Sequence, residues 1–259
     1  MYKIIERSFI MNSFISWIGG KKLLRERIVS MFPTNYEKYV EVFGGAGWVL
    51  FHKKEEKEEI CNDMNSNLIN LFKIVKYHPD AFIKELEFYL NSRQLFNEIK
   101  EDINLKSLTD IQKATRFFVL IKNSYGSKMG TFSADKKDMI KAIDYIKEIS
   151  QRLNKVIIEN LDFEKILNKY DKESTLFYLD PPYFKAENYY KDIAFNEQDH
   201  LRLKEALSSI KGKWILSYND CEYIRDLYKD YNIETVERQN NFKTRYEDNS
   251  IYRELIIKN

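Results

Sequence analysis

The run Thr175-Leu-Phe-Tyr-Leu-Asp-Pro-Pro-Tyr183 decides the fold class of this chain. Its first five residues are a short apolar stretch that predicts a buried strand. Asp180 follows, and then two adjacent prolines, neither of which can donate a hydrogen bond to a strand ladder. The run therefore predicts a strand that stops abruptly and a rigid turn behind it. Open α/β sheets bind ligands at this carboxyl edge.

Asp180, Pro181, Pro182 and Tyr183 offer a chemical site as well as a turn. The stiff backbone fixes the Asp180 carboxylate and the proline carbonyls as hydrogen-bond acceptors, and Tyr183 adds a flat aromatic face. Such a set suits a nucleic-acid base whose exocyclic amine is held by two acceptors and whose ring is stacked from one side. The alternative interpretation is a strand-to-loop turn that Asp180 only caps.

Short β-rich runs alternate with helical patterns outward from this motif, which is typical of an α/β fold with a mostly parallel sheet. The predicted strands cover residues 39–43, 59–62, 156–161, 175–179, 213–217, 233–238 and 251–257. The predicted helices between them cover residues 22–31, 47–54, 65–76, 164–169, 197–210 and 221–229. Only the polar stretch 239–250 separates the last two strands, so they predict a final antiparallel hairpin.

The alternation fails between residues 70 and 154, where the pattern is nearly all helical. Helices are predicted over residues 79–90, 92–101, 108–122 and 136–153, with a Gly-containing loop over residues 123–133. We therefore expect a discontinuous catalytic domain, residues 1–69 and 155–259, with an inserted helical subdomain over residues 70–154.

Composition excludes several classes of protein. The 259 residues include only 8 Gly and 4 Pro, which argues against a low-complexity or Gly/Ser-linked chain. A net charge of +2 with 15% aromatic residues argues against intrinsic disorder. Two separated cysteines and three histidines suggest neither a disulfide framework nor a metal site, and they fit a reducing cytoplasm. No run reaches the roughly 18 apolar residues of a membrane span, so no membrane partner is expected.

A second motif, Glu41-Val-Phe-Gly-Gly-Ala-Gly47, ends a predicted strand and opens a helix. Its glycines let a ligand approach the backbone, and the helix N-terminus adds positive potential. Asp63 follows the next predicted strand, where an acidic residue reaches ribose hydroxyls in doubly wound folds. The alternative is that Asn62 and Asp63 form a turn that caps the helix starting near Asn65.

A third motif, Trp17-Ile-Gly-Gly-Lys-Lys22, is a Gly-containing turn ahead of a helical pattern. Its backbone N–H groups and the Lys21 ammonium predict a site for a carboxylate. The alternative is a turn that only separates the N-terminal segment from the first helix and binds no ligand.

Basic residues gather in the predicted insert. Residues 113–134 carry Lys113, Arg116, Lys122 and Lys128 and no acidic residue. With Tyr125 among them, this stretch could hold a phosphate backbone. The alternative is a solvated helix face followed by a loop.

Taken together, the three motifs, their order and the helical insert before Asp-Pro-Pro-Tyr resemble the Dam-like, D12 class of adenine-N6 DNA methyltransferases. The resemblance covers essentially the whole chain, including Asp162-Phe163 and Ser217-Tyr-Asn-Asp220. It implies a Rossmann-like sheet of the kind found in S-adenosylmethionine-dependent methyltransferases, with a reversed final strand and a target-recognition insert. It also implies S-adenosylmethionine as cofactor, double-stranded DNA as partner and no metal.

The resemblance assigns roles by position. The cofactor-binding residues would be Trp17, Gly19, Lys21, Phe43, Gly45, Gly47, Asp63, Asp162, Phe163 and Asp180. The catalytic residues would be Asp180, Pro181, Pro182 and Tyr183. Asp180 and the Pro181 carbonyl would accept hydrogen bonds from the amine of the target adenine, and Tyr183 would stack on the flipped base. The residues expected to contact DNA are Arg116, Lys122, Tyr125, Lys128 and Tyr190.

The recognition loop departs from the family pattern, because residues 123–133 are short and contain no proline. The resemblance therefore implies the family's reaction, adenine-N6 methylation, more firmly than recognition of the sequence GATC. The alternatives are a methyltransferase of the same fold that acts on RNA adenine and a non-catalytic nucleic-acid-binding relative. The resemblance further suggests a cytoplasmic, bacterial or phage-encoded enzyme, either an orphan or half of a restriction-modification system. It would be a monomer, with dimerisation on DNA as the alternative.

Overall fold

The computed structural model describes residues 10–89, 91–103, 105–133, 139–185, 195–239 and 251–259. The chain divides into two compact units. Unit 1 takes in Met1–Gly20, Gly45–Glu55 and Asp63–Asn160, and unit 2 takes in Lys21–Gly44, Glu56–Asn62 and Leu161–Asn259. The boundaries after Gly20, Gly44 and Asn62 fall inside or beside the motifs that the sequence assigned to a cofactor.

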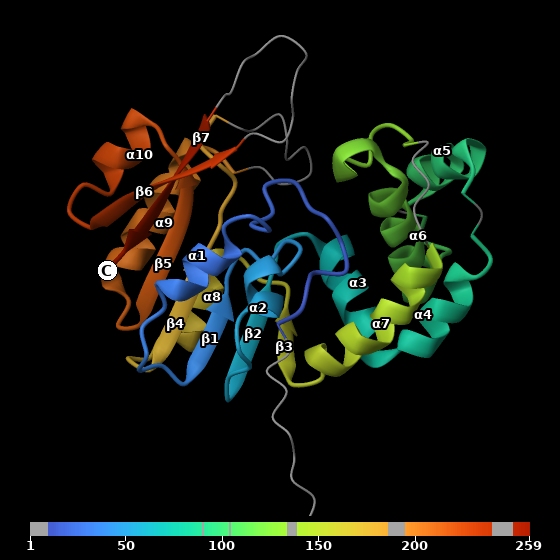
Figure 1. Ribbon diagram of the computed structural model, residues 1–259, viewed down its shortest axis with the longest axis horizontal. Helices are drawn as coiled ribbons and strands as arrows, with labels where there is room; N and C mark the ends of the chain where they lie inside the picture. The colour runs from blue at the N-terminus through green and yellow to red at the C-terminus, as the bar shows by residue number, and fades with distance from the viewer. Residues whose placement is uncertain (1–9, 90, 104, 134–138, 186–194, 240–250) are drawn as a thin grey trace, which may run out of the picture. The chain divides into compact units, whose positions relative to one another are not determined.

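The described residues form a seven-stranded sheet in the order β3-β2-β1-β4-β5-β7-β6 (Figure 1). The strands are β1 (Lys38–Glu41), β2 (Glu58–Asn62), β3 (Val156–Glu159), β4 (Thr175–Leu179), β5 (Lys213–Asn219), β6 (Asn232–Gln239) and β7 (Ile251–Lys258). β1 pairs in parallel with β2 and β4, and β4 pairs in parallel with β5. β7 runs antiparallel to both β5 and β6. The α/β class, the reversed final strand and the closing hairpin are thus confirmed.

The core of unit 2 forms because its strands are apolar and its helices have one apolar face. All five residues of β4 are buried, as a strand covered on both faces requires. The helices of this unit are α1 (Arg25–Ser30), α8 (Phe163–Tyr170), α9 (Glu197–Ser209) and α10 (Glu222–Leu227). Ile166 and Leu167 of α8 and Leu203 and Leu207 of α9 join the same buried cluster as the strands.

Unit 1 is mainly a bundle of helices, which Figure 1 shows from teal to yellow-green. Its helices are α2 (Trp48–His52), α3 (Ser66–Tyr77), α4 (Pro79–Leu86), α5 (Arg93–Asp102), α6 (Asp110–Asn123) and α7 (Met139–Leu153), with a short 3-10 turn η1 (Tyr125–Ser127). The central helix α6 contacts α3, α4 and α5. The predicted insert, residues 70–154, lies wholly inside unit 1, and its separate role in target recognition stays a prediction.

Several strand ends differ by one or two residues from the sequence prediction, among them both ends of β1, which was predicted over residues 39–43, and two of the differences have a clear local reason. β3 stops at Glu159 rather than at residue 161, and the Leu161 N–H donates instead to the side-chain oxygen of Asn62 at 2.8 Å. β5 continues to Asn219 rather than ending at residue 217, because β7 pairs with these extra residues. No described helix has the length and apolar character that crossing a bilayer requires.

Candidate active site

Asp180, the first residue after β4, is held by a buried lysine. The Lys21 Nζ atom lies 2.6 Å from Oδ1 and 2.7 Å from Oδ2 of Asp180. Lys21 is only 4% exposed, whereas the Asp180 side chain keeps 16% exposure. Lys21 Nζ also lies 4.8 Å from the centre of the Tyr183 ring, a cation–π distance. Unit 2 therefore brings together three predicted site residues: Lys21 from the cofactor set, Tyr183 from the catalytic set, and Asp180 from both.

Tyr183 is anchored at its hydroxyl by Glu254, a residue of β7. The phenol donates to Glu254 Oε2 at 2.7 Å, and the same oxygen lies 3.7 Å from Lys21 Nζ. Burial, together with the carboxylates of Asp180 and Glu254, raises the pKa of Tyr183 well above its ordinary value. The phenol therefore stays protonated and remains a donor. We call Lys21, Asp180, Tyr183 and Glu254 the Asp180 cluster.

Phe43 and Phe163, both predicted to border the cofactor, contact each other. Their ring centres are 5.9 Å apart, and Phe195 lies 5.8 Å from each of them. Phe163 is 4% exposed, and the Arg202 guanidinium lies 4.7 Å from its ring centre. Phe43 is only partly buried, so it is the member of this aromatic set with surface left for a ligand.

Asp162, which the resemblance assigned to the cofactor adenine, begins α8. Its Oδ1 atom accepts from the Glu164 N–H at 3.0 Å, the hydrogen bond of an N-cap. It also lies 3.2 Å from the Arg202 guanidinium, which Glu164 and Asp199 bind as well. Asp162 therefore has a structural role in this structure, and 31% of its side chain remains exposed.

A second group of predicted cofactor residues belongs to unit 1. Asp63 accepts from the Gly45 N–H through Oδ2 and from the Asn65 N–H through Oδ1, each at 2.8 Å. Burial raises the pKa of Asp63, and these two hydrogen bonds oppose the rise. Trp17 reaches the same turn, since a Cβ atom added at Gly45 would lie 3.0 Å from its indole ring. Asp63 thus ties the Gly-rich turn to the residue that caps α3.

Three glycines of the predicted cofactor set have positive φ angles. They are Gly19 (φ 75°), Gly45 (φ 49°) and Gly47 (φ 67°). This left-handed region strains residues that have a Cβ atom. Gly47 immediately precedes α2, so its conformation sets the direction in which that helix begins.

The predicted DNA-contacting residues of the insert divide between a helix and a loop. Arg116 and Lys122 lie on α6 and are half-buried, with Lys122 Nζ 5.3 Å from the Phe118 ring centre. Tyr125 is 65% exposed and Lys128 is exposed, both in the loop after α6. Tyr190 lies outside the described residues.

The loop after α6 is a small hairpin. The Ser133 N–H donates to the Asn123 carbonyl at 2.7 Å, and the Tyr125 N–H donates to the Thr131 carbonyl at 2.9 Å. The Ser124 hydroxyl oxygen accepts from the Met129 N–H at 3.0 Å inside the turn. The hairpin therefore holds its exposed tip in a defined conformation despite its short length.

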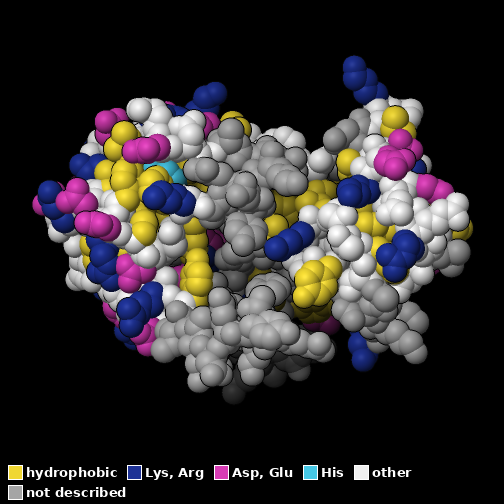
Figure 2. Space-filling view, turned by 90° about the horizontal axis from the view of Figure 1, so that it is seen from above, with side chains coloured by type: hydrophobic (Ala, Val, Ile, Leu, Met, Phe, Trp, Pro, Cys, Tyr) yellow, Lys and Arg dark blue, Asp and Glu magenta, His cyan; other side chains and the backbone are white. Residues whose placement is uncertain are grey.

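On the face shown in Figure 2, charge alone does not single out a DNA-binding surface. The described Lys and Arg side chains of this face lie among acidic ones. The roles of the four described insert residues in DNA binding therefore stay predictions.

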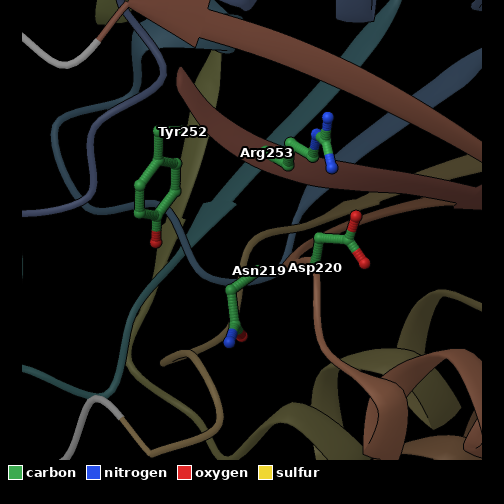
Figure 3. Close-up of a pocket in the computed structure, with 4 residues that line it drawn as sticks. All are labelled: Asn219, Asp220, Tyr252 and Arg253. Carbon is green, nitrogen blue, oxygen red and sulfur yellow. The ribbon is translucent and has the colours of Figure 1, made fainter. Parts of the chain in front are cut away.

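A pocket of about 560 Å³ opens in unit 2 near the end of β5. It is lined by Asn219, Asp220, Tyr252 and Arg253, with Tyr252 and Asn219 on one side and Arg253 and Asp220 on the other (Figure 3). The Asn219 amide donates to the carbonyl of Phe184, the residue after the Asp-Pro-Pro-Tyr motif, at 3.3 Å. The pocket therefore borders the segment that carries Asp180. Among the described residues, no group of three or more His, Cys, Asp or Glu side chains is placed to hold a metal ion.

Comparison with known proteins decides the family. A family model described as D12 class N6 adenine-specific DNA methyltransferase matches residues 17–242. The chain belongs to this family. It is therefore an adenine-specific DNA methyltransferase, and the resemblance drawn from the motifs is confirmed.

Several curated methyltransferases are similar to this D12 class chain over most of their length. The type II methyltransferase M.MjaIII of Methanocaldococcus jannaschii is 31% identical, covering 95% of this chain and 98% of the relative. The type II methyltransferase M1.LlaDCHI of Lactococcus lactis subsp. cremoris is 27% identical, covering 86% and 87%. The DNA adenine methylase of Haemophilus influenzae is 28% identical, covering 94% and 92%.

Three residues near the candidate site of this methyltransferase, Phe195, Arg202 and Glu254, were not predicted from its sequence. Glu254 lies in a strand pattern where a charge usually faces solvent, and Phe195 and Arg202 belong to no recognised motif. Only the sheet register brings Glu254 to Tyr183, and only the packing of α9 brings Arg202 to Phe163. The sequence contains no local signal for these contacts.

Proposed function

We propose that this protein transfers the methyl group of S-adenosylmethionine to the N6 amine of an adenine flipped out of duplex DNA. The observation that supports the proposal best is the Asp180 cluster, in which the acceptor and the aromatic ring of one motif meet the buried cation of another within hydrogen-bond and cation–π distances. The recognition sequence is left open, because the loop that would read bases is short.

Asp180 and Pro181 would align the target amine. The adenine amine is a weak nucleophile because its lone pair is delocalised into the ring. Two acceptors, the Asp180 carboxylate and the Pro181 carbonyl, would favour a more tetrahedral nitrogen and orient that lone pair. Lys21 contacts both Asp180 oxygens, and the 16% of the side chain that stays exposed is where the amine would approach the carboxylate. Alignment of this kind contributes about 7–11 kcal/mol to catalysis.

Tyr183 would support the flipped base from one face. Its ring is fixed at three places: the hydroxyl on Glu254, the Lys21 ammonium 4.8 Å from its centre, and Tyr218 with ring centres 6.1 Å apart. A base taken out of the DNA stack loses its neighbours, and an immobile aromatic ring replaces part of that stacking. The rigid prolines before Tyr183 limit where the ring lies relative to Asp180.

The side chains of the proposed cofactor residues fit S-adenosylmethionine. Each Asp63 oxygen accepts one backbone N–H and keeps a further lone pair for a ribose hydroxyl. Phe43 is partly exposed beside Phe163, which suits the edge of an adenine ring. When bound, the cofactor supplies a methyl group on a sulfonium, which is a positively charged leaving group. Trp17, Gly19, Lys21, Gly45, Gly47 and Asp162 complete the proposed set.

The test is expression in a methylation-free host, followed by sequencing that detects N6-methyladenine in its context. We expect methylation at one short sequence for the unaltered protein and for Asp226→Asn, whose side chain is 76% exposed. We expect none for Asp180→Asn, which presents one acceptor oxygen in place of two. Methylation by Asp180→Asn at the unaltered level would overturn the proposed role of Asp180, and absence of methylation by the unaltered protein would overturn the function.

A further inference from the structure

Glu254 is a buried carboxylate in an apolar strand. The next three residues of β7, Leu255 to Ile257, are at most 1% exposed, and Glu254 itself is 2% exposed. Burial of a charge is costly unless it is paired and hydrogen-bonded. Its partners include the Tyr183 hydroxyl at 2.7 Å and the Lys21 ammonium at 3.7 Å. Both belong to the Asp180 cluster, so the carboxylate is compensated by the residues of the candidate active site.

The reversed direction of β7 explains why Glu254 reaches this place. β7 is antiparallel to β5, and Glu254 is in register with Asn219, the last residue of β5. The carboxyl end of β5, which lies beside β4 in the sheet, therefore pairs with the first half of β7. A parallel strand at this position would bring its last residues to that edge instead. The reversal thus adds a side chain from the end of the sequence to the site formed by β4.

We propose that Glu254 is a positioning residue for methyl transfer, acting by holding the Tyr183 phenol and the Lys21 ammonium in one arrangement around Asp180. The inference rests on the proposed function, in which Tyr183 stacks on the target base. It adds a residue that no motif of the chain identifies.

Glu254, Tyr183 and Lys21 each contact the other two. Glu254 accepts from Tyr183, Lys21 lies over the Tyr183 ring, and Glu254 lies beside Lys21. Each side chain is thereby held by the other two, which restricts the rotation of the phenol ring about its own axis and of the lysine about its terminal bonds. Lys21 lies closer to Asp180 than to Glu254. A shift of the lysine side chain would therefore also move the Asp180 carboxylate, the proposed acceptor.

The experiment compares Glu254→Gln, Tyr183→Phe and the double variant on a duplex that carries the methylated sequence. Glu254→Gln keeps the size of the side chain and removes its charge, whereas Tyr183→Phe keeps the ring and removes the hydroxyl. We expect each single variant to lower kcat on the order of 10–100-fold with KM for DNA unchanged, because misplacement by about 1 Å costs this much. The double variant should be no slower than the slower single variant, because both act on the same contact: Glu254→Gln removes the charge that strengthens it and Tyr183→Phe removes its donor.

The control is Glu237→Gln on the paired strand β6, since Glu237 forms an exposed ion pair with Arg253. It should retain the unaltered kcat. A second readout uses 2-aminopurine at the target position, whose emission should rise in Glu254→Gln because stacking on a loosened ring quenches it less. This readout separates a positioning role of Glu254 from a purely structural one. If the role were only structural, Glu254→Gln would change the midpoint of unfolding and leave the 2-aminopurine emission unaltered.

Three outcomes would overturn the inference. They are an unaltered kcat in Glu254→Gln, multiplied losses in the double variant, and equal 2-aminopurine emission in the variant and the unaltered protein. If Glu254→Gln does not fold, Tyr183→Phe still removes the hydrogen bond between the phenol and Glu254, and its kcat decides the question. Failure of the proposed function is distinct, because the unaltered protein would then methylate no adenine.

Discussion

Removal of the Lys21 ammonium tests whether the buried ion pair of the Asp180 cluster supports the fold. Lys21→Met keeps most of the apolar stem and deletes the charge. Asp180, at 2.6 Å, and Glu254, 2% exposed and 3.7 Å away, would then lose their shared cation. Breaking a buried pair in this way costs about 3–5 kcal/mol. Because Asp180 is 16% exposed, we expect the lower end, about 3 kcal/mol of unfolding free energy, or a fall of roughly 6–12 °C in Tm.

The neighbouring residue provides a matched control. Lys22 is exposed, so Lys22→Met should change the unfolding free energy by no more than about 0.5 kcal/mol. The double variant Lys21→Met/Asp180→Asn should be more stable than Lys21→Met, because it also removes one of the uncompensated charges.

Urea unfolding followed by circular dichroism and by tryptophan fluorescence measures these differences. Coincident transitions are needed, since a chain of two compact units can unfold in two steps. The reasoning is refuted if Lys21→Met is as stable as Lys22→Met, or if Asp180→Asn lowers the stability of the Lys21→Met background further.

Three further predictions concern other parts of the chain. Gly45→Ala should lower Tm by forcing a Cβ atom onto a residue with φ of 49°, whereas Gly130→Ala, whose added Cβ meets nothing closer than 3.9 Å, should not. Burial lowers the pKa of His200 to about 4, so its contribution to stability is complete above pH 6.5 and is lost as the pH falls toward 4. Urea unfolding at several pH values should show a weaker pH dependence in His200→Asn than in the unaltered protein. Lys128→Ala should reduce the slope of log affinity for DNA against log salt by about 0.9, and an unchanged slope would mean that this side chain contacts no phosphate.

Most of the fold was predictable because the strands of this chain are short apolar runs bounded by clear breaks. Both ends of β4 were predicted correctly from the run before Asp180. The two prolines that follow cannot donate ladder hydrogen bonds, so the strand ends before them. The final hairpin was also predictable, because a polar stretch with no helical pattern separates its strands. The position of β7 between β5 and β6 was not, because strand order depends on long-range packing that no local pattern records.

The candidate site was predictable only where a motif supplies consecutive residues. Asp180 and Tyr183 share one motif, and Lys21 belongs to another, so each was identified from its own neighbours. Their meeting at 2.6 and 4.8 Å depends on the fold. Glu254 was missed for the opposite reason. Its own sequence neighbours are ordinary strand residues, and its importance comes entirely from a register with β5 that the sequence does not state.

The structural and functional interpretations of Asp63 are compatible rather than exclusive. The sequence left open whether Asp63 caps a turn or holds a ribose, and both of its oxygens accept backbone N–H groups at 2.8 Å. An asparagine there has one acceptor oxygen, so Asp63→Asn would break one of these hydrogen bonds whatever the residue does for a ligand. Loss of activity in that variant would therefore not establish a ribose contact. A substitution of Asp162 would likewise disturb both structure and ligand binding, because Asp162 caps α8. Tyr183→Phe is different, because it removes the hydroxyl and leaves the ring that would stack on the base.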